Sequence, residues 1–148
     1  MLYDLNTQVA TALAVTSSAV VSDSVSLAVA SDIGKGSNLN VHFQVVTAAF
    51  VSGTDLTLEV ISATDGALTA DVEVIGSAGT IAAADLTLNA QFVARINPRS
   101  LSQTKGTHVG VRLTPTGTFS TGEMDARITP AAIDSRDYHD ANTPGVIT

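Results

Sequence analysis

The 148-residue sequence contains no cysteine and no tryptophan. Without cysteine, the chain has no disulfides, thiolate metal ligands or cysteine nucleophiles, and its redox compartment stays undetermined. A chain of this length buries roughly two thirds of its extended surface. We therefore expect one domain that is held together by an ordinary hydrophobic core.

Basic side chains are also scarce, with seven Lys and Arg against fourteen Asp and Glu, for a net charge of −7. Lys35 is the only base in the first 74 residues, which hold eight acids. This balance argues against a nucleic acid or an anionic membrane as a partner, because both require a positive surface. No apolar run approaches the roughly 18 residues of a membrane span. The N-terminal stretch lacks the positive region of a secretory signal and contains Asp4, so we predict no signal peptide.

One stretch of the second half is locally positive. No acid occurs between Asp85 and Glu123, and four bases lie there: Arg95, Arg99, Lys105 and Arg112. This strip either docks an acidic neighbour or forms a solvated strand face with its loops.

Alternation of apolar and polar residues dominates the pattern, which is typical of half-buried strands. About eight such runs occur, at 25–29, 39–45, 56–60, 72–74, 86–88, 92–96, 109–113 and 124–128. Phe43 and Phe92 fall on their apolar positions and are predicted to be core residues. Eight short strands bury their apolar faces best as two stacked sheets. We therefore predict an all-β fold, a jelly-roll-like antiparallel β-sandwich.

The connecting segments carry turn chemistry. Asp65-Gly66 in "ATDG" (63–66) predicts a tight hairpin. Further turns are expected at 76–80, 96–100, 114–118 and 120–123, with Pro98 and Pro115 outside the strands, and one short helical turn within 80–86.

Both ends of the chain lack a clean period, which predicts an N-terminal arm at 1–17, a sandwich at 18–130 and a C-terminal tail at 131–148. Tyr3 and Tyr138 lie in these end segments, where an amphipathic ring could anchor an arm to a partner. The alternative is that both segments wrap their own sandwich.

Catalytic and metal-binding motifs are weak throughout. Gly34-Lys35-Gly36-Ser37 departs from the phosphate-binding GxxxxGK[ST] pattern and precedes a strand instead of a helix. The acidic and histidine cluster at 134–142 lacks the EF-hand spacing, and His42, His108 and His139 share no zinc-ligand spacing. No GxSxG elbow occurs, and the carboxylates Asp55, Glu59, Asp71 and Glu73 fit an ordinary polar sheet face. We expect no cofactor, no metal and no enzymatic activity.

The order of segments resembles a known family. The chain contains "SLAVASDIGKGSNLNVHFQVVTAAF", "DLTLEVISATDG", "QFVARINP", "THVGVRLTPTGTFSTGEMDARITP" and a tail ending "DYHDANTPGVIT". Together these segments are similar to the jelly-roll capsid cement (decoration) proteins of tailed phages, of the Bordetella-phage type. The most specific matches are the Asp32-Ile33-Gly34-x-Gly36 turn, the "GTFSTGEMDARIT" hairpin and the tail from Tyr138 to Gly145.

The resemblance implies a virion protein without an active site. Such proteins are made in the host cytoplasm and bind the outer surface of the assembled head. There they bridge neighbouring capsomers as homodimers, with a trimer as the alternative, and stabilise the shell against the pressure of packaged DNA. Its implied partners are the major capsid protein and a second copy of the chain. The partner-binding candidates are Tyr3, Arg95, Arg99, Arg112, Arg136 and Tyr138.

Two other classes compete with this interpretation. A carbohydrate-binding jelly roll is disfavoured because the chain offers no tryptophan platform. A β-sandwich module of a tail fibre or a cell-surface adhesin is not separated from a cement protein by composition.

Overall fold

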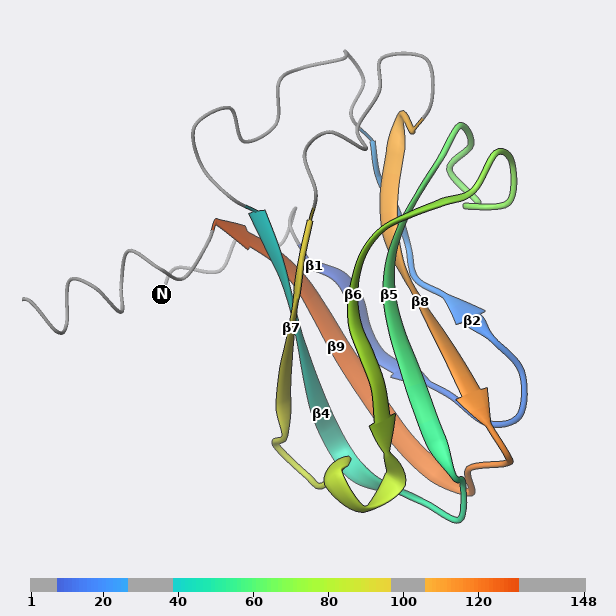
Figure 1. The fold of residues 1–148 in the computed structure, drawn as a ribbon, viewed down its shortest axis with the longest axis vertical. Coiled ribbons are helices and arrows are strands. Elements are labelled where there is room, and N and C mark those ends of the chain that lie inside the picture. Colours follow the sequence, from blue (N-terminus) through green and yellow to red (C-terminus); the bar gives the residue numbers. More distant parts are fainter. Residues whose placement is uncertain (1–7, 27–38, 97–105, 131–148) are drawn as a thin grey trace, which may run out of the picture.

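The computed structural model describes residues 8–26, 39–96 and 106–130. These residues form nine strands and one short 3-10 helix, shown in Figure 1. The elements are β1 (Gln8–Ala14), β2 (Val20–Val21), β3 (Val25–Ser26), β4 (Leu39–Val51), β5 (Asp55–Ala63), β6 (Glu73–Ala82), η2 (Ala83–Asp85), β7 (Gln91–Arg95), β8 (His108–Thr116) and β9 (Thr121–Pro130). No helix in these ranges is long and apolar enough to cross a membrane.

The strands form two antiparallel sheets that pack face to face (Figure 1). Sheet A has the order β1-β9-β4-β7, and sheet B has the order β2-β8-β5-β6, with β3 also paired to β8. This order results from strand pairs that are nested along the sequence. The innermost pair is β5–β6, and the pairs β4–β7, β2/β3–β8 and β1–β9 enclose it in that order. Counting β2 and β3 as one interrupted strand gives eight strands in the jelly-roll arrangement. The predicted fold class is confirmed.

Alternating side chains of both sheets build the core between them. Val41, Phe43 and Val45 of β4 are fully buried. Facing them from sheet B are Leu56, Leu58 and Val60, while the rings of Phe50 and Phe119 meet edge to face at 5.2 Å. Phe43 is 0% exposed and Phe92 is half-buried against the same cluster, so both predicted core residues are confirmed.

The connection between β5 and β6 is longer than the predicted tight hairpin. It spans residues 64–72 and folds back over the outer face of sheet B, where Leu68 packs with Ile61 and Ala63. Leu68 adopts a positive φ of 58°, and the Asp65 carboxylate accepts hydrogen bonds from the Thr69 and Ala70 N–H groups. The predicted tight turn was wrong, although β5 and β6 do form a hairpin, because Asp65 organises a wide loop instead of a two-residue turn.

Glycines inside β6 explain a second difference between the structure and the predicted turns. Residues 76–80, expected as a turn, lie within this strand, whose pairing with β5 is broken by two register shifts. Gly79 takes a φ of +88° at the first irregularity. A Cβ at Gly76 would lie 2.5 Å from the Arg95 carbonyl oxygen, so glycine allows β6 to approach the backbone of β7 across the sandwich edge.

Three smaller differences concern strand ends. Residues 86–88 form no strand, because Leu86 closes η2, the short helical turn predicted within 80–86. Pro115 lies near the end of β8 and not outside it. Residues 8–14, expected in an N-terminal arm, form β1 of sheet A; register shifts and Ala12 at a φ of +46° conceal its alternation.

Candidate functional site

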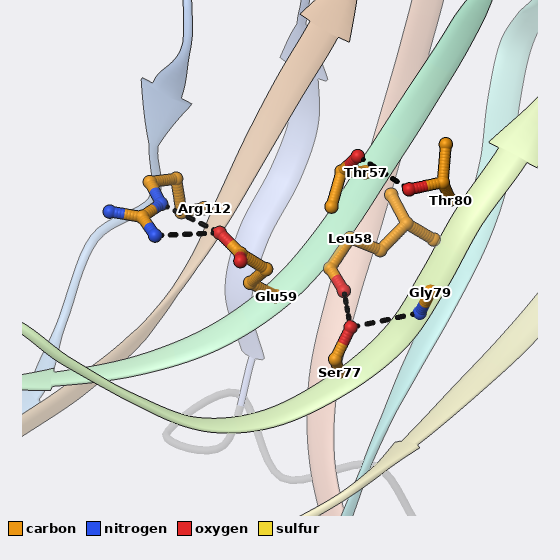
Figure 2. Close-up of polar contacts among 7 residues, drawn as sticks. All are labelled: Thr57, Leu58, Glu59, Ser77, Gly79, Thr80 and Arg112. Atoms are coloured by element: carbon orange, nitrogen blue, oxygen red, sulfur yellow. Dashed lines mark hydrogen bonds and ion pairs between the residues drawn. The ribbon is translucent and has the colours of Figure 1, made fainter.

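The outer face of sheet B has most of its central polar groups paired with one another (Figure 2). The Arg112 guanidinium donates to Glu59 Oε2 from Nε at 2.8 Å and from a terminal nitrogen at 2.7 Å. The hydroxyls of Thr57 and Thr80 lie 2.8 Å apart on neighbouring strands. Asp55, at the first residue of β5, is the exception, because its Oδ1 is buried without a hydrogen-bond partner among the described residues.

A serine side chain completes the hydrogen bonding at the edge of sheet B. Between β2 and β3, Ser22 Oγ accepts a hydrogen bond from the Val111 N–H at 2.9 Å and donates one to the Asp23 carbonyl at 2.7 Å. Ser22 is only 8% exposed. Its hydroxyl therefore replaces a backbone acceptor where the strand is interrupted.

The outer face of sheet A carries polar side chains in three cross-strand rows. The β4 residues Asn40, His42 and Gln44 alternate with the buried core residues, so they point outward. The register gives the rows Arg95–Asn40–Thr129, Val93–His42–Arg127–Gln8 and Gln91–Gln44–Asp125. Four strands thus contribute to one mixed polar surface.

A cavity of about 160 Å³ opens in this surface. Seven residues line it: His42, Phe43, Gln44, Gln91, Asp125, Arg127 and Thr129. Both carboxylate oxygens of Asp125 already accept hydrogen bonds, Oδ1 from the Ala12 N–H at 2.7 Å and Oδ2 from Arg127 at 3.4 Å. We call this cavity the sheet A pocket.

In the pocket lining, His42 Nε2 and Thr129 Oγ1 are buried without a hydrogen-bond partner among the described residues. Thr129 is 7% exposed. Burial lowers the pKa of His42 below its ordinary 6.5, so its imidazole is neutral at neutral pH. Buried polar groups normally have partners, so these two need an explanation.

The structure places two of the predicted partner-binding residues on different sheets. Arg95 is exposed at the end of β7 in sheet A, whereas Arg112 is paired with Glu59 in sheet B. Tyr3, Arg99, Arg136 and Tyr138 lie outside the described residues, as do Lys35, Lys105 and the 134–142 cluster. The two described arginines of the predicted strip therefore do not share one face.

Sequence reasoning missed the pocket residues His42, Gln44 and Thr129. For His42 and Gln44, the available signal was the polar half of the alternation at 39–45, which we used only to assign a strand. In the described ranges, no group of three His, Asp or Glu side chains could hold a metal ion.

By its architecture, the protein is an all-β jelly roll of two antiparallel sheets. The chain belongs to the Bbp16 family, whose family model matches residues 9–128 and so covers nearly the whole sandwich. The family name indicates a Bordetella phage protein, in agreement with the phage origin that the sequence resemblance implies. No curated protein matches the chain.

Proposed function

We propose that this protein is a capsid cement protein, which binds the outer surface of the phage head and bridges neighbouring capsomers. The observation that carries this proposal is membership of a phage protein family across residues 9–128, and the jelly-roll fold agrees with it. Its partners are then the major capsid protein and a second copy of the chain. Its location is the virion, on the outer capsid surface.

This function requires no catalysis, and we propose that the protein is not an enzyme. A protein that binds the assembled lattice but not the separated subunits stabilises the lattice by its binding free energy. Each contact can be modest, because symmetry repeats it over the shell. The net charge of −7 disfavours nucleic acid and anionic membranes as partners.

The number of copies per virion tests the proposal. Quantitative mass spectrometry of purified virions, referenced to the major capsid protein, should give on the order of hundreds of copies, because capsid lattices repeat each site by symmetry. A few copies per particle would contradict the cement function and favour a module of the tail. Virions that lack the protein should lose packaged DNA at a lower temperature than complete virions.

A further inference from the structure

We propose that the sheet A pocket is the docking site for one carboxylate side chain of the capsid protein. The proposal rests on the cement function proposed above and assigns a face and a ligand chemistry to it. Sheet A would then face the shell, and the outer face of sheet B would be directed away from this contact.

The contrast between the two outer faces carries the argument. On sheet B, central polar groups bond to each other, as in the Arg112–Glu59 and Thr57–Thr80 pairs (Figure 2), and the one buried unpaired atom described on this face, Asp55 Oδ1, lies at the first residue of β5. On sheet A, His42 Nε2 and Thr129 Oγ1 are withdrawn from water beside a cavity and have no partner among the described residues. An unpaired buried polar group destabilises the free protein. A ligand that supplies the missing partners would remove this penalty only in the bound state.

The size and donors of the pocket define what fits. Its volume of about 160 Å³ is similar to cavities of roughly 150 Å³ that hold a benzene-sized group, so it accommodates one side chain. The Gln44 and Gln91 amides, the Thr129 hydroxyl and the imidazole can all donate hydrogen bonds. Asp125, the carboxylate of the lining, already accepts two hydrogen bonds. These donors suit a ligand that accepts hydrogen bonds.

The charge of the surrounding rows favours an anionic acceptor. Arg127 and Asp125 form an ion pair at 3.4 Å and offset each other. Arg95, exposed in the row that contains Thr129, has no ion-pair partner among the described residues and adds a positive charge. Charge-assisted hydrogen bonds to a carboxylate are stronger than those to a neutral amide.

The first test removes a hydroxyl without changing side-chain shape. The variant Thr129→Val is compared with Thr114→Val, a matched change at a half-buried threonine on the outer face of sheet B. Binding of the full-length protein is titrated on purified phage heads that lack it. We expect Thr129→Val to weaken binding about 5- to 10-fold, the equivalent of one hydrogen bond. Thr114→Val should leave binding unchanged.

The melting temperature of the free protein separates docking from a structural role. Because the Thr129 hydroxyl has no described partner, Thr129→Val should unfold at the same temperature as the wild type or higher. A lower melting temperature would show that the hydroxyl is bonded within the chain and would overturn the proposal. Unchanged head binding by Thr129→Val would also overturn it.

A second substitution tests the charge of the ligand. Gln44→Glu places a negative charge in the pocket and should weaken head binding more than 10-fold, whereas Thr114→Glu on sheet B should have little effect. Equal binding by Gln44→Glu and the wild type would exclude a carboxylate ligand. Wild-type protein that fails to bind the heads would overturn the cement function as well, so the two failures are distinguishable.

Discussion

Replacing Ser22 by alanine should destabilise the sandwich far more than an edge serine usually does. The Ser22 hydroxyl accepts the hydrogen bond of the Val111 N–H, and Val111 is 0% exposed in the middle of β8. In the variant this amide would be buried without an acceptor. The interrupted strand would also lose the hydrogen bond from Ser22 Oγ to the Asp23 carbonyl.

The magnitude follows from the asymmetry of hydrogen-bond energetics. A typical intramolecular hydrogen bond contributes about 1 kcal/mol net, but a buried donor left unsatisfied costs roughly 1–3 kcal/mol. The backbone bond from the Ser22 N–H to the Val111 carbonyl at 3.0 Å remains, so the strand still pairs. We therefore expect Ser22→Ala to lower the free energy of unfolding by about 2 kcal/mol.

Urea denaturation measures this change, and Ser24→Ala provides the control. The Ser24 hydroxyl donates to the Gly66 carbonyl at 2.9 Å but is exposed, so its loss should cost less than about 1 kcal/mol. Amide hydrogen exchange should report faster exchange at Val111 in Ser22→Ala. Equal destabilisation by both variants, or unchanged protection of Val111, would refute the reasoning.

Three further changes test other contacts. Gly110→Ala places a Cβ against Leu68 and 2.9 Å from Ser22 Oγ, and should lower the unfolding free energy by about 1–3 kcal/mol in urea denaturation; no loss would mean that both neighbours shift freely. Glu59→Gln should cost about 0.5–1 kcal/mol and lose part of this effect in high salt, because the pair with Arg112 is partly exposed; salt-independent loss would argue against an ionic contribution. Hydrogen bonds from the Ala70 N–H and from Thr69 lower the pKa of Asp65 from 3.8 to about 2. The stability that the Asp65 carboxylate contributes is therefore complete above about pH 4 and is lost as the pH falls through about 2. Because Asp65→Asn lacks this ionisable group, its free energy of unfolding should fall less steeply with decreasing pH. An NMR titration midpoint near 3.8 for Asp65 would contradict this prediction.

Alternation predicted the jelly roll because a strand that faces one core must repeat every two residues. The runs at 39–45 and 56–60 became β4 and β5 with the expected inward residues. Alternation failed where a tertiary contact determined the backbone. Gly76 was expected in a turn but lies within a strand, because β7 lies against it. Leu86 was expected in a strand, but a turn of 3-10 helix buries it instead.

The candidate site was less accessible to sequence reasoning than the fold. Val41 and Phe43 indicate which residues of β4 face the core, so His42 was predictable as an outward residue. Its proximity to Arg127 was not, because the β4–β9 register joins segments about 85 positions apart and leaves no local pattern. Pairing of Arg112 with Glu59 is likewise a property of the β5–β8 register and not of composition.

The nesting of the strand pairs also constrains the synthesis of the protein. The contact between the Ala12 N–H and the Asp125 carboxylate spans 113 positions, so sheet A cannot close until β9 has left the ribosome. The innermost pair, β5 and β6, needs only the chain between residues 55 and 82. Assembly from this local hairpin outward is the cheapest route in loop entropy, and β1 would be the last strand to dock. A nascent chain stopped before β9 would expose the edges of β4 and β1 together, so ribosome stalling before Thr121–Pro130 has emerged increases the risk of aggregation.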